Sequence, residues 1–327
     1  MFIKKILLPN KKLTSNFGLG CSSLMSIENN LEREALIKLA IDNGILHFDL
    51  ARYYGLGKAE EEFTKITNNI SQEITISSKF GIIDSFSATP LKHNQNKLRK
   101  IINISKPIKI LAKFLYSINS MKRNYSSENC KRSLKDSLSA LNLKIIDIYF
   151  FHEPLASKQI DNYILSTLEE LKSQSKIGAY GFSGNLNIIY DILKNKKIMG
   201  LEVIQFDEKS SNKFYLEKIQ KLLGNRVIFK SRFGIIRTHL IKLNNLFLKN
   251  QSLCDLWSNK LKLNLKDKDD LCFALIASFL TKYPDDLLLY STRKLKRLEK
   301  LLMKLNDPYY NKILETEFIS FYDDIVK

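Results

Sequence analysis

The sequence predicts an α/β protein in which eight parallel strands close into one barrel, and three observations lead to that fold class. Eight short apolar runs alternate with stretches of helical period along the 327 residues. Several runs are apolar without interruption, as expected for a parallel sheet that is buried on both faces. Polar residues also stand at the ends of five successive runs, where the loops of a (β/α)8 TIM barrel form its active face.

The expected strands follow one another from near the N-terminus to near the C-terminus. They read FGLGCSSLM (17–25), ILHFDLA (45–51), EITISSKFGI (73–82), IIDIYFFHE (145–153), IGAYGFSG (177–184), LEVIQFD (201–207), RVIFKSRFG (226–234) and DLLLYST (286–292). A doubly wound sheet is the alternative, but its first strand is usually followed by GxGxxG, and GLGCSS does not match that pattern. We therefore expect a single barrel domain over residues 1–327.

Helical stretches separate these runs. In residues 31–44, Leu36, Leu39 and Ala40 recur at helical spacing, and Gly44 suits the end of the helix. In residues 128–142, three leucines recur at the same spacing. Each pattern predicts a helix that packs one apolar face on the barrel.

Composition restricts the classes of function. Lys and Arg outnumber Asp and Glu by 52 − 34 = +18, an excess that would suit nucleic acid or an anionic membrane. No recognised nucleic-acid-binding motif accompanies the charge, so we expect lysines on the outer faces of helices and no nucleic-acid partner. No apolar stretch is long enough to cross a bilayer, and the apolar run near the N-terminus is too short for a signal peptide.

Cysteine and histidine are few and scattered. The four cysteines form no CxxC, and the four histidines show neither ligand spacing nor an accompanying carboxylate cluster. Free cysteines are typical of a reducing compartment, so we expect a cytoplasmic protein without a metal site. A metal-dependent barrel hydrolase or isomerase therefore lacks support.

The polar strand ends form the candidate active site. Asp49, Lys79, His152, Ser183 and Gln205 end the second to sixth expected strands. A single polar residue at a strand end is commonly structural, but packing alone does not explain five in succession. We expect these side chains to meet at one end of the barrel.

Four motifs in order show a resemblance to the aldo-keto reductase family over nearly the full length. They are DxAxxYG from Asp49 to Gly55, ISSKFG with Lys79, DIYFFHEP with His152, and the pair YGFSGN and VIQFD. The resemblance implies an NAD(P)H-dependent oxidoreductase that interconverts a carbonyl group, in an aldehyde, ketone or aldose, and an alcohol. A non-catalytic, nucleotide-sensing regulatory barrel is the alternative that the sequence leaves open.

The resemblance also assigns roles to the catalytic set. Tyr54 is the expected general acid, and His152 is expected to orient the substrate carbonyl. A free phenol is a poor acid at neutral pH, so we expect the Lys79 ammonium to lower the pKa of Tyr54 while Asp49 holds that ammonium in place. The neighbouring Tyr53 is interpreted as packing or as a wall of the pocket.

The resemblance implies a further set of residues on the cofactor side. Asn185 stands one place later than in the family's Ser-Asn pair, Lys230 replaces an aromatic platform, and Lys300 and Leu301 replace the family's Glu-Asn ending. The expected cofactor-binding residues are Cys21, Ser22, Ser183, Asn185, Gln205, Lys230, Ser231, Ser291, Thr292 and Arg297. The last three resemble a grip on the adenosine 2′-phosphate, which favours NADP(H), with NAD(H) as the other possibility. An exposed basic helix is the alternative interpretation of the STRKLKRLEK segment.

An extended basic insertion is expected over residues 82–127. It has no acidic residue from 85 to 127, and residues 105–118 have the period of an amphipathic helix. Three interpretations remain open: packing on the barrel rim, a basic lid that attracts an anionic substrate, or membrane contact through residues 92–123. The long loop resembles the family branch that includes sugar dehydrogenases acting on galactose- or fucose-like aldoses.

Overall fold

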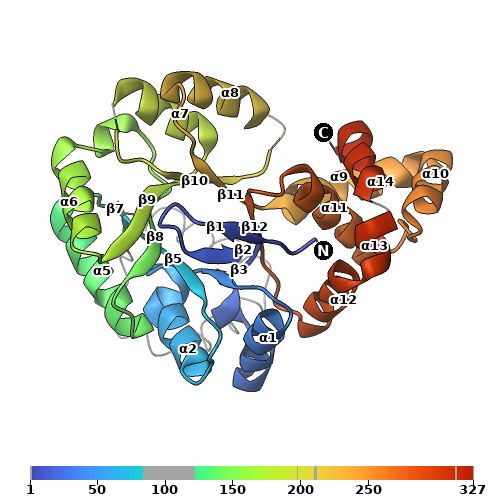
Figure 1. The fold of residues 1–327 in the computed structure, drawn as a ribbon, viewed down its shortest axis with the longest axis horizontal. Helices are drawn as coiled ribbons and strands as arrows, with labels where there is room; N and C mark the ends of the chain where they lie inside the picture. The colour runs from blue at the N-terminus through green and yellow to red at the C-terminus, as the bar shows by residue number, and fades with distance from the viewer. Residues whose placement is uncertain (1, 84–121, 197, 210–211, 314, 327) are drawn as a thin grey trace, which may run out of the picture.

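A closed barrel of eight parallel strands forms the centre of the protein (Figure 1). The computed structural model describes residues 2–83, 122–196, 198–209, 212–313 and 315–326. The strands, in the order in which they pair around the barrel, are β3 (Phe17–Gly20), β4 (His47–Asp49), β5 (Thr75–Phe80), β8 (Ile146–His152), β9 (Ile177–Gly184), β10 (Val203–Asp207), β11 (Phe229–Phe233) and β12 (Leu287–Tyr290), which pairs back with β3. Every predicted apolar run contains one of these strands, so the predicted (β/α)8 single-domain fold is confirmed.

Helices cover the outside of the barrel, and those of the C-terminal third gather on one side (Figure 1). They are α1 (Asn30–Asp42), α2 (Lys58–Thr67), α5 (Ser127–Leu141), α6 (Asn162–Ser173), α7 (Leu186–Asn195), α8 (Asn212–Leu223), α9 (Ile235–Lys249), α10 (Gln251–Leu261), α11 (Lys268–Lys282), α12 (Leu295–Asn306), α13 (Pro308–Ile313) and α14 (Glu315–Phe321), with a π-helical turn at Tyr322–Val326.

The two helices predicted from periodicity begin and end for local reasons. The Asn29 side chain caps α1 by accepting from Leu31 N, and Gly44, at φ +84°, follows its end. Leu36 and Ala40 are buried as predicted, and Leu39 is half-buried. In α5 the cap is Ser126, so both predicted helices are confirmed.

An antiparallel hairpin covers the N-terminal end of the barrel, and the sequence analysis did not anticipate it. Its strands are β1 (Lys5–Leu7) and β2 (Leu13–Ser15). Asn10 donates to the Asp147 carboxylate at 3.2 Å, and the same carboxylate accepts from Ile76 N at 2.7 Å. Thr14 and Thr75 share a buried hydrogen bond of 2.6 Å, so the hairpin is tied to the first residues of the strands.

An ionic cluster on the outside of the barrel joins three neighbouring strands. It consists of Glu208, just after β10, Arg232 of β11, and Asp286, just before β12. The Arg232 guanidinium contacts Glu208 at 2.7 Å and Asp286 at 2.6 Å. It also lies 3.7 Å from the centroid of the Tyr283 ring, and its side chain is only 3% exposed. One cation therefore compensates two carboxylates away from water, which makes the arrangement sensitive to loss of the arginine.

The predicted basic insertion falls mostly outside the described residues. Its two ends are described: β6 (Ile82–Ile83) pairs antiparallel with β7 (Lys122–Arg123) beside β5. The proposed amphipathic helix and the interpretations attached to residues 92–121 are not tested by the structure. Within the ranges that the structure does describe, no helix has both the length and the apolar character needed to cross a membrane.

Candidate active site

Four side chains meet at the C-terminal end of the barrel strands, and all four belong to the predicted catalytic set. Asp49 is the last residue of β4, Lys79 comes from β5, and His152 is the last residue of β8. Tyr54 lies in the turn after β4. The Lys79 ammonium donates to Asp49 at 2.6 Å and to the Tyr54 hydroxyl at 3.2 Å, and the His152 ring lies 5.8 Å from the Tyr54 ring.

The turn after β4 is built so that Asp49 and Tyr54 face the same lysine. Tyr54 N donates to Ala51 O at 2.9 Å and begins a short 3-10 helix, Tyr54–Gly57. Gly55 and Gly57 have φ of +59° and +87°, a region that favours glycine. The chain therefore reverses within a few residues, and α2 begins at once.

The Asp49 carboxylate has a hydrogen bond on each oxygen. Besides the Lys79 ammonium on Oδ2, Oδ1 accepts from Ser77 at 2.7 Å and from the Gln205 amide at 2.9 Å. Burial alone would raise the pKa of Asp49, but Lys79 and these hydrogen bonds lower it below its usual value. The carboxylate stays ionised at neutral pH and anchors the ammonium, as the sequence analysis expected.

The pKa of Tyr54 shows that one expectation was wrong. Burial and the Asp49 carboxylate raise the pKa of the Tyr54 phenol well above its usual value, whereas the lysine was expected to lower it. The physical reason is that Asp49 largely neutralises the ammonium, so the phenol experiences burial more than it experiences a free cation. Tyr54 is therefore a neutral hydroxyl at neutral pH, with a proton to donate.

His152 is a neutral imidazole at the mouth of the barrel. Burial, aided by the Lys79 ammonium, lowers the pKa of His152 to about 3. Its backbone is fixed by the Tyr125 hydroxyl, which donates to His152 O at 2.6 Å. The Tyr53 ring also lies edge-on to His152 at 6.3 Å, so Tyr53 packs beside the predicted catalytic set.

Buried neutral histidines predict that stability falls in mild acid. Burial lowers the pKa of His47 to about 4, and its imidazole contacts Thr75 and Ser77 inside the barrel. Because the unfolded chain binds these protons near pH 6.5 and the folded chain does not, the unfolding free energy should decrease as pH falls below about 6.5. For His47 the total loss should be on the order of 3 kcal/mol, complete near its folded pKa.

Urea unfolding at several pH values between about 7.5 and 5.5 measures the slope of the unfolding free energy against pH. This range lies above the one in which carboxyl groups titrate. The His47→Gln variant, which keeps an amide for the two hydroxyls, should give a shallower slope than the wild type. Equal slopes in the two proteins would contradict the prediction.

Four of the predicted cofactor-side residues are joined to the Asp49 cluster by hydrogen bonds. Ser183 donates to Gln205 Oε1 at 2.6 Å, and Gln205 Nε2 approaches Ser231 Oγ at 3.4 Å. Cys21 is buried beside the same strands and its amide donates to Asp49 O at 2.9 Å. Ser77, which holds Asp49, was not predicted, although its place two residues before Lys79 on the same strand face was a usable signal.

The remaining cofactor-side predictions lie further out. Asn185 precedes α7, where its side chain accepts from Lys209 at 2.9 Å, and Lys230 is half-buried on β11. Ser22 is exposed after β3, and Ser291 donates to Gly20 O at 2.8 Å. The structure thus separates this set into an inner group at Gln205 and residues further out, with Ser22 and Ser291 at the ends of β3 and β12 and Asn185 after β9.

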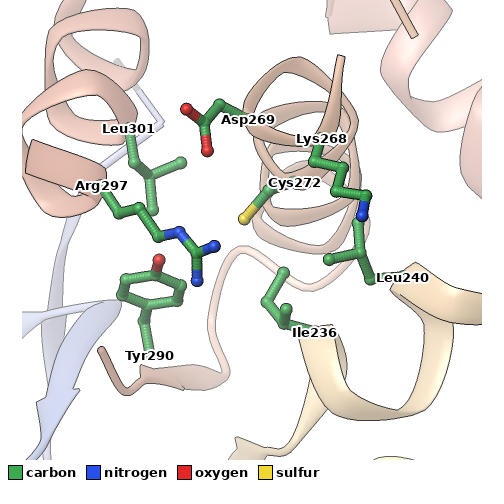
Figure 2. A pocket seen from close by; sticks show the side chains of 8 residues that line it. All are labelled: Ile236, Leu240, Lys268, Asp269, Cys272, Tyr290, Arg297 and Leu301. Carbon is green, nitrogen blue, oxygen red and sulfur yellow. The ribbon is translucent and has the colours of Figure 1, made fainter. Parts of the chain in front are cut away.

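Arg297 lines a pocket among β12, α9, α11 and α12 (Figure 2). Its guanidinium points into the pocket beside the Tyr290 ring, with the Cys272 thiol opposite (Figure 2). The full lining is Ile236, Leu240, Lys268, Asp269, Cys272, Tyr290, Arg297 and Leu301. Only Arg297 was predicted as a binding residue here; the lining residues from α9 and α11 belong to segments that gave no motif.

The site offers hydroxyl, amide and imidazole groups at one end of the barrel, and its Lys79 ammonium donates a hydrogen bond to the Tyr54 phenol. Among the described residues, no three His, Cys, Asp or Glu side chains gather so that they could hold a metal ion. The arrangement can donate a proton from Tyr54 and hydrogen-bond a carbonyl oxygen through His152.

Comparison with known proteins gives the following findings. A sequence model described as the Aldo/keto reductase family matches residues 17–207. The solved structure of aldo-keto reductase AKR11C1 from Bacillus halodurans has a TM-score of 0.67 and 15% identity over 97% of this chain and 96% of that chain. The glycerol dehydrogenase AKR11B4 from Gluconobacter oxydans has a TM-score of 0.60 and 15% identity over 99% and 96%. A search of curated proteins returned no match.

Proposed function

The chain belongs to the aldo/keto reductase family, and on that premise we propose that it reduces a carbonyl group, or oxidises the corresponding alcohol, by hydride transfer with Tyr54 as the acid–base group. The observation that supports this most directly is the Lys79 ammonium, which donates to both Asp49 and the Tyr54 hydroxyl. The same group of residues also includes a neutral imidazole, that of His152.

The described residues fit a nicotinamide cofactor. Ser183, Gln205 and Ser231 present an amide and two hydroxyls beside Asp49, a donor and acceptor set that suits a carboxamide. When bound, the nicotinamide supplies or accepts the hydride. These three residues would hold the carboxamide, and the substrate would enter from the same end of the barrel.

Side chains of the protein supply the proton that the reaction needs. In the direction of reduction, Tyr54 donates its proton to the oxygen that becomes the alcohol, and its raised pKa keeps it protonated until that moment. The Lys79 ammonium, 3.2 Å from the phenol oxygen, stabilises the phenolate that remains. His152 donates a hydrogen bond to the same substrate oxygen and fixes the direction of the carbonyl.

A carbonyl screen tests the proposal. Aldehydes, ketones and aldoses are offered with NADPH or NADH while the absorbance of the reduced nicotinamide is followed. Turnover with at least one class supports an oxidoreductase. Tight cofactor binding with no turnover in either direction would instead support the regulatory alternative.

We further propose that NADP(H) is the preferred cofactor, with its adenosine end in the pocket of Figure 2. Arg297 offers a guanidinium there, and Ser291 and Thr292 precede α12 on the same side. A guanidinium suits a 2′-phosphate because it can donate two parallel hydrogen bonds. The free cysteines of the described chain agree with a cytoplasmic location, which we also propose.

Arg297→Ala should therefore weaken NADPH binding by about 10-fold, the equivalent of one charge-assisted contact. NADH binding should change by less than about 2-fold. Titration of cofactor fluorescence measures both constants, and Arg293→Ala, an exposed neighbour outside the pocket lining, is the matched control. Equal binding of the two cofactors, unchanged in the Arg297 variant, would contradict the phosphate site.

For the substrate we propose a polyhydroxylated carbonyl compound such as an aldose. The long-loop branch to which the sequence is similar includes aldose dehydrogenases, and one structural neighbour is a glycerol dehydrogenase. Both similarities support the proposal of a hydroxyl-rich substrate. The screen above separates aldoses from simple aldehydes.

A further inference from the structure

A buried carboxylate lies directly behind the turn that bears Tyr54. Glu60, in the first turn of α2, is fully buried. Its Oε1 accepts from Ser78 at 2.7 Å and from Ser137 at 2.8 Å, and its Oε2 accepts from Arg52 at 2.6 Å. Both oxygens therefore have partners, and the carboxylate joins three parts of the chain: the turn after β4, strand β5 and helix α5.

The strand partner of Glu60 is adjacent to the lysine of the active site. Successive residues of a strand face opposite sides, so Ser78 points outward to Glu60 while Lys79 points inward to Asp49 and Tyr54. Arg52, which donates to the other oxygen of Glu60, lies two residues before Tyr54 in the chain. Glu60 thus links the segment that bears the phenol to the strand that bears its ammonium partner.

The turn after β4 leaves room for the Arg52 side chain because residue 57 is a glycine. Gly57 has φ +87°, and a Cβ added there would lie 2.5 Å from Arg52 Nη2 and 3.0 Å from Cζ. The guanidinium therefore packs against the glycine backbone on one side and Glu60 on the other. Arg52 is only partly exposed, with 26% of its side chain accessible, so it is not an ordinary surface arginine.

We propose that Arg52, through Glu60, is a positioning residue that sets the distance between the Tyr54 hydroxyl and the Lys79 ammonium. This inference rests on the proposed function, because it assigns Arg52 a part in proton donation by Tyr54. Arg52 touches neither the phenol nor the lysine in the contacts described. It holds the turn at 50–57 against β5, and this restraint sets the 3.2 Å contact between the Lys79 ammonium and the Tyr54 hydroxyl.

The expected effect is on turnover rather than on binding. Displacing a reacting group by about 1 Å can cost about 100-fold in rate. Arg52→Ala should therefore lower kcat by about 10- to 100-fold, with KM for the carbonyl substrate and Kd for NADPH within about 2-fold of the wild type. Arg52→Lys, which keeps a cation facing Glu60, should recover most of the lost kcat.

Helix α2 provides a matched control two residues further along. Arg33 of α1 contacts Glu62 at 2.9 Å, and these side chains are 8% and 14% exposed. This pair also joins an arginine to a carboxylate of α2, but it does not touch the Tyr54 turn. Arg33→Ala should lower the melting temperature at least as far as Arg52→Ala while leaving kcat within about 2-fold.

Hydrogen exchange gives a readout that does not depend on activity. Amides of residues 50–57, among them Tyr54 N with its bond to Ala51 O, should exchange about 10-fold faster in Arg52→Ala and at the wild-type rate in Arg33→Ala. Unchanged exchange in this turn would overturn the proposal whether or not a substrate has been found. If the turn exchanges faster in Arg52→Ala but the wild-type protein turns over no carbonyl, the role of Arg52 in holding the turn stands and the proposed function is overturned.

If the wild type is active, two kinetic results would also overturn the positioning role. One is a kcat for Arg52→Ala equal to that of the wild type. The other is an equal loss of kcat in the Arg33 and Arg52 variants, because that would indicate general destabilisation.

Discussion

Tyr54→Phe should reduce turnover by about 10²- to 10⁴-fold, the range expected when a positioned general acid is lost. Phenylalanine keeps the ring that lies edge-on to His152 but removes the hydroxyl to which Lys79 donates. The alkoxide that forms during reduction would then lack its proton donor. Steady-state rates with the best substrate of the carbonyl screen measure the loss.

Cofactor binding separates this effect from misfolding. Because Ser183, Gln205 and Ser231 do not contact the Tyr54 hydroxyl in the bonds described, Kd for the cofactor should stay within a few-fold. Tyr53→Phe is the matched control, since it removes a neighbouring phenol in the same turn. Undiminished turnover in the Tyr54 variant would remove the assignment of this residue as the acid.

The largest expected effect on stability follows from Arg232→Met. The substitution leaves the buried Glu208 carboxylate and the partly buried Asp286 carboxylate without their shared cation, which should lower the unfolding free energy by about 3–5 kcal/mol. Urea unfolding at neutral pH measures the change. The deficit relative to wild type should shrink as pH falls, because burial raises the pKa of Glu208 and, without the arginine, its carboxyl group would bind a proton more readily in the folded variant than when unfolded.

An exposed ion pair of the same region provides the comparison. Arg237 contacts Asp207 at 2.7 Å, but its side chain is 70% exposed, so Arg237→Met should change stability by about 1 kcal/mol or less. Similar losses in the two variants would contradict the view that burial makes the Arg232 cluster critical.

The barrel could be predicted from the sequence because its signals are local. Each strand is a short apolar run, and β8 is buried over its full length, from Ile146 to His152. The polar strand ends were equally accessible, because a parallel barrel places the same end of every strand on one face. Asp49, Lys79 and His152 therefore meet as expected once the strands pair in order.

What the sequence did not reveal depends on contacts between distant segments. The pKa of Tyr54 depends on how far Asp49 neutralises Lys79 and on how deeply the phenol is buried, and neither quantity is encoded in a motif. The pocket at Arg297 joins α9, α11 and α12 to β12, and no local pattern shows which faces of these distant helices meet. The hairpin β1–β2 was also missed, because its short strands alternate weakly and its contacts include residues 61 and 137 positions away.

The short ribbon β6–β7 has a consequence for how this protein can change over evolution. Ile83 pairs with Lys122, so the two described ends of the insertion lie side by side, close after β5, the strand that bears Lys79. Closing a loop costs only about 0.6 kcal/mol more for each doubling of its length, far less than the loss of one core side chain. Insertions and deletions at this edge are therefore nearly neutral for folding, and selection for new substrates can proceed there while the barrel itself is conserved.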